Sequence, residues 1–132
     1  MIKFRYREEP SIITETVLRP IADVILKVNN TKVEAAMYID SGADITLIPF
    51  GLGKALGLRQ NSENKILEIK GVSGAGVPYI LKEVILVLNE KELSIRLAWA
   101  LTEEVPLLLG RLDIFAKFKI TFDEKQKIVI FH

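Results

Sequence analysis

The residues best suited to chemistry in this chain are carboxylates, and among them Asp40 has the most distinctive surroundings. The chain contains no cysteine and a single histidine, His132, which argues against thiolate chemistry, disulfides, histidine-based triads and histidine-rich zinc sites. Asp40 follows the apolar residues 37–39 and opens the turn Asp40-Ser41-Gly42, after which the apolar pair Leu47-Ile48 follows. This arrangement predicts a carboxylate held in a tight turn at the rim of a hydrophobic core.

The segments before Asp40 are predicted to form a hairpin that carries it. Residues 21–28 are rich in β-branched side chains, and Asn29-Asn30-Thr31 is a turn signal. Residues 32–39 then return, with alternate apolar residues on one face: Val33, Ala35, Met37 and Ile39. The turn that begins at Asp40 therefore lies at the far end of this hairpin.

The remainder of the chain is predicted to form further strands and one or two short helices. Strands are expected at residues 2–6, 65–70, 79–88, 92–101, 105–110, 119–122 and 127–131, an extended segment at 11–18, and short helices at 49–58 and 111–118. Residues 119–122 and 127–131 are predicted to pair as a final hairpin around residues 123–126. The apolar residues 128–131 are ordinary core in one interpretation and, in the other, an edge that pairs with another molecule. Because no linker or repeat interrupts the pattern, we expect a single, mainly β domain over residues 1–132.

Three motifs, in their order along the chain, resemble those of the retropepsin-like aspartic proteases, both retroviral and cellular. They are Asp40-Ser41-Gly42-Ala43-Asp44, the glycine-rich hairpin tip from Gly71 to Tyr79, and Leu108-Leu109-Gly110-Arg111. In that family a strand ends in Asp-Thr/Ser-Gly-Ala, a flap hairpin follows, and an apolar pair plus glycine packs behind the catalytic loop. The resemblance spans residues 21–131, whereas residues 1–18 have no clear counterpart. It implies a retropepsin-like acid protease barrel with a flap hairpin, acting as an aspartic endopeptidase.

Peptide hydrolysis by carboxylates needs two of them that share one proton, one to activate water and one to protonate the carbonyl oxygen. Asp-Ser-Gly occurs once, and the remaining aspartates lie in no second turn of this kind: Asp23, Asp44, Asp113 and Asp123. One chain therefore supplies half of a site. We expect an isologous homodimer in which Asp40 of each copy meets the other across a two-fold axis. This chemistry needs no metal and no organic cofactor.

The resemblance also implies roles for the residues that follow the catalytic acid. Ser41, Gly42 and Ala43 would support the catalytic loop, with the Ser41 hydroxyl serving the loop of the partner chain and Gly42 admitting the substrate backbone. Asp44 would form a structural ion pair with Arg111, as the matching residues do in retroviral relatives, or would contact substrate directly. An ordinary surface turn is the competing interpretation of the same residues.

The glycine-rich tip is expected to close over substrate as a flap. The substrate-binding residues of this interpretation are Asp44, Val72, Ser73, Gly74, Ala75, Gly76 and Val77. Apolar residues near the groove suggest apolar subsites: Val72, Val77 and Ile80. A phosphate-binding loop is a competing interpretation, but the tip lacks the Lys-Ser/Thr ending of a P-loop, and a strand rather than a helix is expected to follow. A plain mobile hairpin is the third interpretation.

The composition restricts the kinds of partner that the chain is expected to have. Lys+Arg number 18 and Asp+Glu number 17, which leaves a net charge of +1 and gives no reason to expect a nucleic-acid or anionic membrane partner. Residues 1–9 contain no uninterrupted apolar run of the signal-peptide type, and the chain has no run of about 18 apolar residues. We therefore expect a cytoplasmic location, a peptide or protein substrate, and neither a nucleic-acid nor a membrane partner.

The favoured interpretation is thus a homodimeric aspartic endopeptidase. The first alternative is a catalytically silent retropepsin-like dimer that binds extended peptides in the same groove. The second is a structural oligomerisation domain whose hairpins pair with one another. Replacing Asp40 by Asn separates these classes, because cleavage needs the carboxylate whereas dimerisation and peptide binding do not.

Overall fold

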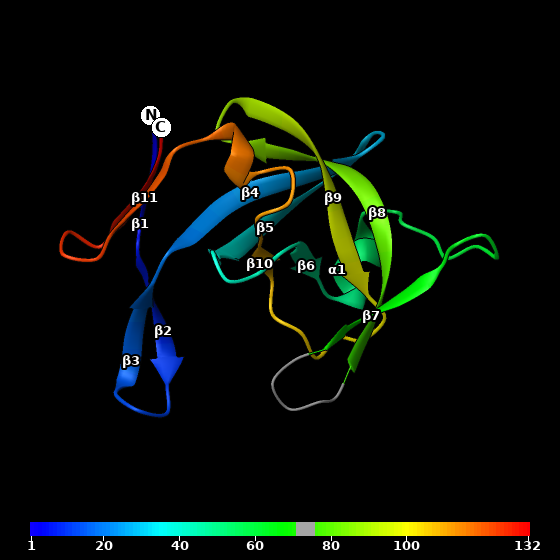
Figure 1. The fold of residues 1–132 in the computed structure, drawn as a ribbon, viewed down its shortest axis with the longest axis horizontal. Coiled ribbons are helices and arrows are strands. Elements are labelled where there is room, and N and C mark those ends of the chain that lie inside the picture. Colours follow the sequence, from blue (N-terminus) through cyan, green and yellow to red (C-terminus); the bar gives the residue numbers. More distant parts are fainter. Residues whose placement is uncertain (71–75) are drawn as a thin grey trace.

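Six strands close on themselves to form a barrel at the centre of the molecule (Figure 1). The structure is a computed structural model in which residues 1–70 and 76–132 are described. The main sheet has the strand order β4-β5-β10-β6-β9-β8-β7, and β4 also pairs with β8, which closes the first six strands into a ring. The bounds are β4 (Ile21–Val28), β5 (Thr31–Ile39), β6 (Thr46–Ile48), β7 (Ile66–Lys70), β8 (Gly76–Leu88), β9 (Lys91–Ala100) and β10 (Leu108–Leu109). The predicted mainly β fold is confirmed.

The predicted hairpin before Asp40 is formed by β4 and β5. Its register runs from Ile21 opposite Tyr38 to Val28 opposite Thr31, and Asn29 takes the positive φ of 53° that its tight turn requires. Alternation along β5 buries Ala35, Met37 and Ile39. The strand therefore enters the barrel wall with one face fixed in the core, and Asp40 follows directly where the strand ends.

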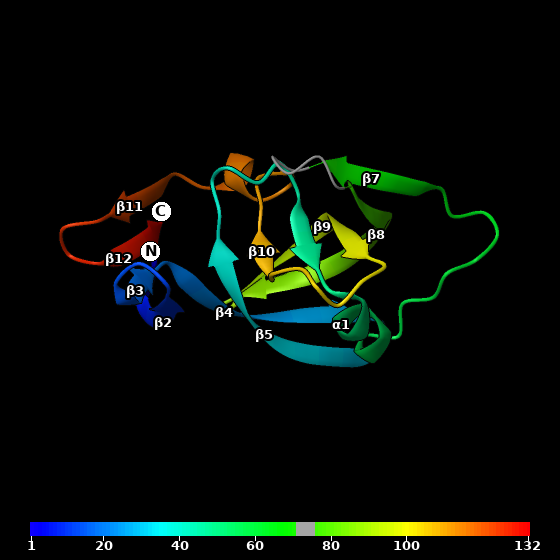
Figure 2. The same cartoon turned by 90° about the horizontal axis from the view of Figure 1, so that it is seen from below.

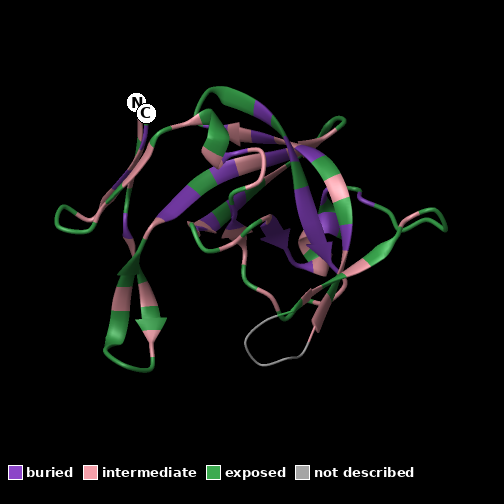
Figure 3. Ribbon diagram, viewed as in Figure 1, coloured by how far each residue is buried: buried purple, intermediate pink, exposed green. Residues whose placement is uncertain are grey.

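The core lies between β4, β5, β8 and β9, and Figure 3 shows buried residues concentrated along these strands. Trp99 is fully buried, stacks on Phe50 at 5.3 Å between ring centroids, and donates its indole N–H to the Phe50 carbonyl at 3.0 Å. This contact closes one end of the barrel with the helix that begins at Phe50. Among the described residues, Thr46 is the only buried polar side chain.

The first predicted helix is confirmed as α1 (Phe50–Ala55). Gly57 ends it with a φ of +88°, and the amides of Gly57 and Leu58 donate to the carbonyls of Lys54 and Gly53 at 2.9 Å each. This pair of hydrogen bonds is a Schellman motif, which a glycine in the left-handed region forms without steric strain. The polar residues 59–64 that follow connect the helix to β7.

Two elements after the barrel strands are shorter than predicted. The expected helix at 111–118 is reduced to a single 3₁₀ turn, η1 (Phe115–Lys117), because Asp113 has a φ of 65° that interrupts a right-handed helix. The expected strand at 105–110 is reduced to β10. Pro106 lacks an amide hydrogen, so it cannot donate to a strand ladder at that position.

The two ends of the chain pair with each other in a separate sheet at one side of the barrel (Figure 2). Its order is β1-β12-β11, formed by β1 (Ile2–Arg5), β12 (Ile128–Phe131) and β11 (Ile120–Asp123). The predicted hairpin of residues 119–122 and 127–131 is confirmed by the pairing of β11 with β12. The expected pairing of the last strand with another molecule is wrong, because β1 of the same chain occupies its other edge. The buried Val129 and Phe131 match the alternative that these residues are ordinary core. Phe131 also packs edge-on against Phe4 and Phe118, at 5.9 and 5.3 Å between centroids.

Residues 7–19 form a hairpin of their own, where a single extended segment was predicted. It consists of β2 (Arg7–Ser11) and β3 (Glu15–Arg19), and it projects away from the barrel in Figure 1. Residues of β2 alternate between partly buried and exposed, β3 is exposed except at Val17, and no residue of either strand is fully buried (Figure 3). At its tip Ile12 and Ile13 are fully exposed. Within the described residues, no helix is long and apolar enough to cross a membrane.

Candidate active site

Asp40 is positioned by β5, which ends just before it, by β6, which follows its turn, and by β10 from a distant part of the sequence. β10 lies between β5 and β6, parallel to the first and antiparallel to the second. The main-chain N–H of Asp40 donates to the Leu109 carbonyl at 3.0 Å, and that of Ile39 donates to the Pro20 carbonyl at 2.8 Å. The carboxylate is half-buried. Its backbone is thus fixed on both sides before the chain turns.

The turn after Asp40 holds the carboxylate through its own backbone. The Gly42 amide donates to Oδ1 of Asp40 at 2.9 Å, and the Ala43 amide donates to the Asp40 carbonyl at 3.2 Å. A Cβ atom at Gly42 would lie 3.3 Å from that same Oδ1, so glycine leaves the carboxylate face open. Ser41 and Gly42 are exposed. The second oxygen, Oδ2, has no hydrogen bond from the described residues and is available to a reactant.

A buried hydroxyl and a glycine support this turn from behind. The Gly110 amide donates to Oγ1 of Thr46 at 3.1 Å in a buried setting. A Cβ atom at Gly110 would lie 2.3 Å from the Ile45 carbonyl carbon, which no larger residue could tolerate without backbone movement. The Arg111 amide then donates to the Ala43 carbonyl at 2.9 Å. The predicted packing of Leu108-Leu109-Gly110 behind the loop is therefore present, and Thr46 is the residue that completes it.

The predicted ion pair between Asp44 and Arg111 is not formed in this single chain. The ion pairs among the described residues join other partners. The Arg111 guanidinium instead lies 3.5 Å from the Ser41 carbonyl and 6.0 Å from the centre of the Phe115 ring. The contact near Asp44 is made by backbone alone, since the Leu112 amide donates to the Asp44 carbonyl at 2.9 Å. The Asp44 carboxylate is consequently left on the exposed side of the turn.

A cavity of about 530 Å³ opens on the flap side of the turn. It is lined by Asp40, Gly42, Ala43 and Asp44 from the turn, and by Ile69, Lys70 and Tyr79 from the β7–β8 hairpin. The structure thus brings four of the predicted site residues into one cavity with the base of the hairpin. Ile69 and Tyr79 were not predicted from the sequence. To predict that Ile69 and Tyr79 lie on the cavity side of β7 and β8, one would have needed the register of these two strands.

The predicted flap is described only at its base. β7 and β8 pair from Ile66 opposite Ile80 to Lys70 opposite Gly76. Four of the predicted substrate-binding residues lie outside the described residues: Val72, Ser73, Gly74 and Ala75. Val77 is partly buried against the small cluster of Leu47, Ala98 and Ala100. The expectation that Ile80 lines a subsite is wrong, because Ile80 is 2% exposed and belongs to the core.

A second cavity, of about 610 Å³, shares the lining residues Asp40 and Leu108 with the first. One wall is formed by Tyr38, Pro106 and Leu107 of the barrel, and the other by Glu9 of the hairpin β2–β3. Sequence reasoning missed this wall because residues 7–19 match none of the family motifs. Residues 7–19 also show no regular alternation of polar and apolar side chains that would fix their placement. Asp40 therefore lines two cavities.

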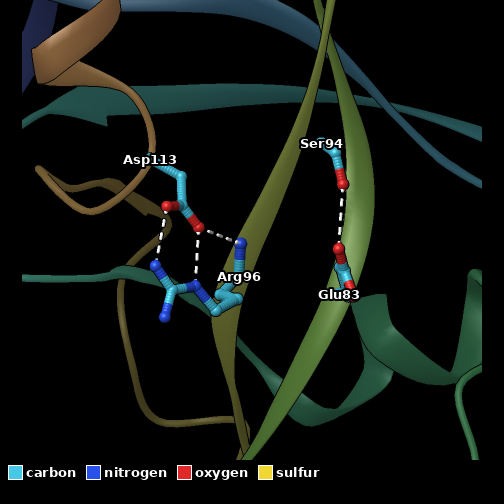
Figure 4. Close-up of polar contacts among 4 residues, drawn as sticks. All are labelled: Glu83, Ser94, Arg96 and Asp113. Carbon is cyan, nitrogen blue, oxygen red and sulfur yellow. Dashed lines mark hydrogen bonds and ion pairs between the residues drawn. The ribbon is translucent and has the colours of Figure 1, made fainter.

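A charged cluster on the outside of the barrel holds the segment after Gly110 in place (Figure 4). The Arg96 side chain donates to both oxygens of Asp113 at 2.8 Å, and the Arg96 amide donates to Oδ2 at 3.0 Å. These hydrogen bonds lower the pKa of Asp113 to about 2 and raise the pKa of Arg96. Beside them Ser94 donates to Glu83 at 3.0 Å across β8 and β9. No group of three or more potential metal-ligating side chains occurs in the described residues.

The comparisons with known proteins bear on this geometry. No family model and no curated protein matches the chain. A solved structure described as EIAV protease complexed with the inhibitor HBY-793 matches it with a TM-score of 0.59, over 75% of this chain and 86% of that chain. The chain has the retropepsin-like fold.

The sequences of the two retropepsin-like chains are 22% identical, so the match bears on the fold and not on activity. It confirms the expected barrel architecture. A quarter of this chain lies outside the match, since 100% minus the 75% covered leaves 25%.

Proposed function

We propose that this chain is an aspartic endopeptidase that works as a homodimer. The observation that carries the proposal is the placement of Asp40: in a retropepsin-like fold, it lies in a glycine turn and lines two cavities. Each chain has one such turn. The second carboxylate of the reaction then comes from Asp40 of a second copy.

The proposed reaction uses the pair of Asp40 carboxyl groups as one unit that carries a single proton. The ionised carboxyl accepts a proton from water, whose oxygen attacks the peptide carbonyl carbon. The protonated carboxyl donates its proton to the carbonyl oxygen, giving a neutral tetrahedral intermediate. Return of a proton to the amide nitrogen then releases the amine as the C–N bond breaks. Because the two groups titrate together, the pH dependence belongs to the pair and not to either residue.

The cavity on the flap side suits an extended peptide. Its apolar lining from Ile69 and Tyr79 can hold substrate side chains, and the exposed Asp44 carboxylate is free to accept hydrogen bonds from substrate amides. Closure of the β7–β8 hairpin over the peptide would add main-chain hydrogen bonds along it. These contacts require a segment with no internal structure of its own, which points to unfolded or loop segments as substrates.

The deciding experiment combines molecular mass in solution with peptide cleavage. The wild-type chain is expected to have twice the mass of a single chain and to cleave members of a diverse peptide library between about pH 4 and 7. Asp40→Asn should lower cleavage by about 100-fold or more while the mass stays unchanged. Asp123→Asn is the matched control, because Asp123 lies in the terminal sheet and caps the local amide of Gln126. A statine-type transition-state mimic should inhibit the wild type.

Persistent cleavage by the Asp40→Asn variant would show that the carboxyl pair is assigned wrongly. A wild-type dimer that binds extended peptides and cleaves none would identify the silent peptide-binding dimer instead. A dimer that neither binds nor cleaves peptides would leave the structural oligomerisation domain as the remaining interpretation. A monomer that cleaves with undiminished activity would exclude the shared site.

A further inference from the structure

The hairpin β2–β3 makes two side-chain contacts with the barrel at its base. Arg7 forms an ion pair with Asp23 of β4, and the Arg19 guanidinium lies 5.5 Å from the centre of the Tyr38 ring. Tyr38 is two residues before Asp40 on β5. The base of the hairpin is therefore fixed beside the strand that delivers the catalytic carboxylate, whereas the tip extends away from the barrel (Figure 1).

This attachment makes the hairpin one wall of the second cavity. Glu9, Pro10 and Arg19 line that cavity together with Tyr38 and Asp40. An isolated two-stranded hairpin is marginally stable in water, so its orientation depends on the contacts at its base. A ligand that enters the cavity of about 610 Å³ touches both the hairpin and the neighbourhood of Asp40.

The chemistry of the cavity favours one kind of side chain. Its barrel wall is apolar, with Tyr38, Pro106 and Leu107. The one cation that lines it, Arg19, is placed over the Tyr38 ring, and among the described residues Glu9 is in no ion pair. A long side chain with an apolar stem and a basic end matches this combination, because its stem can lie along the apolar wall while its charge reaches Glu9.

We propose that the hairpin β2–β3 forms a side-chain pocket of the substrate groove, and that Glu9 selects lysine or arginine at the substrate position that fills it. The inference rests on the proposed function in one respect, that a peptide lies across Asp40. It adds a wall that residues 7–19 supply and that the family motifs do not include.

The test measures peptide binding by the full chain that carries Asp40→Asn, so that cleavage does not enter the result. The probes are positional-scanning octapeptide pools in which one position is fixed as lysine, norleucine or glutamate. Norleucine keeps the apolar stem of lysine and lacks its charge. At one position, lysine pools should bind about fivefold more tightly than norleucine pools, and glutamate pools more weakly than both.

The matched variants separate Glu9 from its neighbour. Glu9→Gln in the same background should remove the preference for lysine over norleucine, and Glu9→Lys should shift it towards glutamate. Glu8→Gln, which removes an exposed charge next to it in the strand, should leave the preference unchanged. A lysine preference that survives Glu9→Gln, or no lysine preference at any position, overturns the inference.

A second copy of the chain is the competing occupant of the hairpin surface. The double variant Ile12→Ser/Ile13→Ser removes the exposed apolar tip and leaves the lining residues intact. An unchanged solution mass and lysine preference support the pocket. A variant that becomes monomeric and loses the preference shows that the hairpin serves dimerisation instead. The wild-type cleavage assay reports separately on the proposed reaction, so lysine-selective binding without cleavage would contradict that reaction alone.

Discussion

The main-chain amide of Asp40 donates to the carbonyl of Leu109 at 3.0 Å. This hydrogen bond joins the end of β5 to the end of β10, two strands that run parallel and are far apart in the sequence. The carboxylate therefore depends for its position on a segment that contributes no reactive group. Substitutions behind the turn should affect the site without touching the substrate.

The hydroxyl of Thr46 is the first such position. Thr46→Val leaves the Gly110 amide without its buried acceptor, so the free energy of unfolding should fall by about 1–3 kcal/mol. Urea denaturation measures this loss. Thr46→Ser is the matched control, because it keeps the oxygen and removes only a methyl group. If both variants lose the same stability, packing of the methyl group and not the hydrogen bond is responsible.

Gly110 is the second position. Gly110→Ala should lower the free energy of unfolding by about 1–3 kcal/mol or more, because the added Cβ would lie 2.3 Å from the Ile45 carbonyl carbon. In an active protein it should also lower kcat, since Ile45 follows the turn that begins at Asp40. Gly51→Ala is the control in α1, where the nearest atoms belong to the flexible end of Glu103. A Gly110→Ala protein as stable as the wild type would contradict the packing seen here.

The pair of Arg96 and Asp113 predicts how stability depends on pH. Since folding lowers the pKa of Asp113 from 3.8 to about 2, its contribution is complete above pH 4 and is lost as the pH falls through 2. Thermal unfolding measured between pH 2 and 6 should therefore show a difference in Tm between wild type and Asp113→Asn that becomes smaller towards pH 2. Glu124→Gln, which removes an exposed ion pair with Lys127, is the comparison. A difference in Tm that stays constant from pH 2 to 6 would argue that ionisation of Asp113 is not its source.

Gly57 tests the end of the helix. Its φ of +88° lies in the region that a side chain strains, so Gly57→Ala should cost about 1–2 kcal/mol although no atom lies within 4 Å of the added Cβ. Gly57→Asn should cost less, because asparagine tolerates this region better than alanine. Chemical denaturation of the two variants checks the order. If the Gly57→Ala variant were as stable as the wild type, backbone strain would be excluded as the reason for glycine at this position.

Much of the barrel could be anticipated because its signals are local. The alternation of apolar residues before Asp40, the Asn29 turn and the glycine after α1 each depend on a few neighbouring residues. One of the two errors near the end of the chain has the opposite cause. The expected helix at 111–118 is interrupted at Asp113, whose carboxylate binds Arg96 of a strand, and such a partner is invisible in a local pattern. The shortened strand at 105–110 is different, because Pro106 is a local signal.

The terminal sheet and the hairpin β2–β3 show the same limit. The predicted hairpin of residues 119–122 and 127–131 is confirmed as β11 and β12, because its turn signal is local. The second partner of β12 is β1, which was not predicted. It lies at the other end of the chain, and no local pattern shows which distant strand pairs with a free edge.

By itself the sequence determined the chemistry that is available: one Asp-Ser-Gly turn between apolar strands, no thiol, and a glycine-rich hairpin. It also determined which faces of β4 and β5 are buried, because alternation is a property of the chain. Only the tertiary structure decided that Asp40 lines two cavities, that Thr46 and Gly110 support its turn, and that Glu9 of a separate hairpin lines one of these cavities. Those relationships arise from pairing between distant segments, whose choice depends on the packing energy of the whole barrel and not on any local preference.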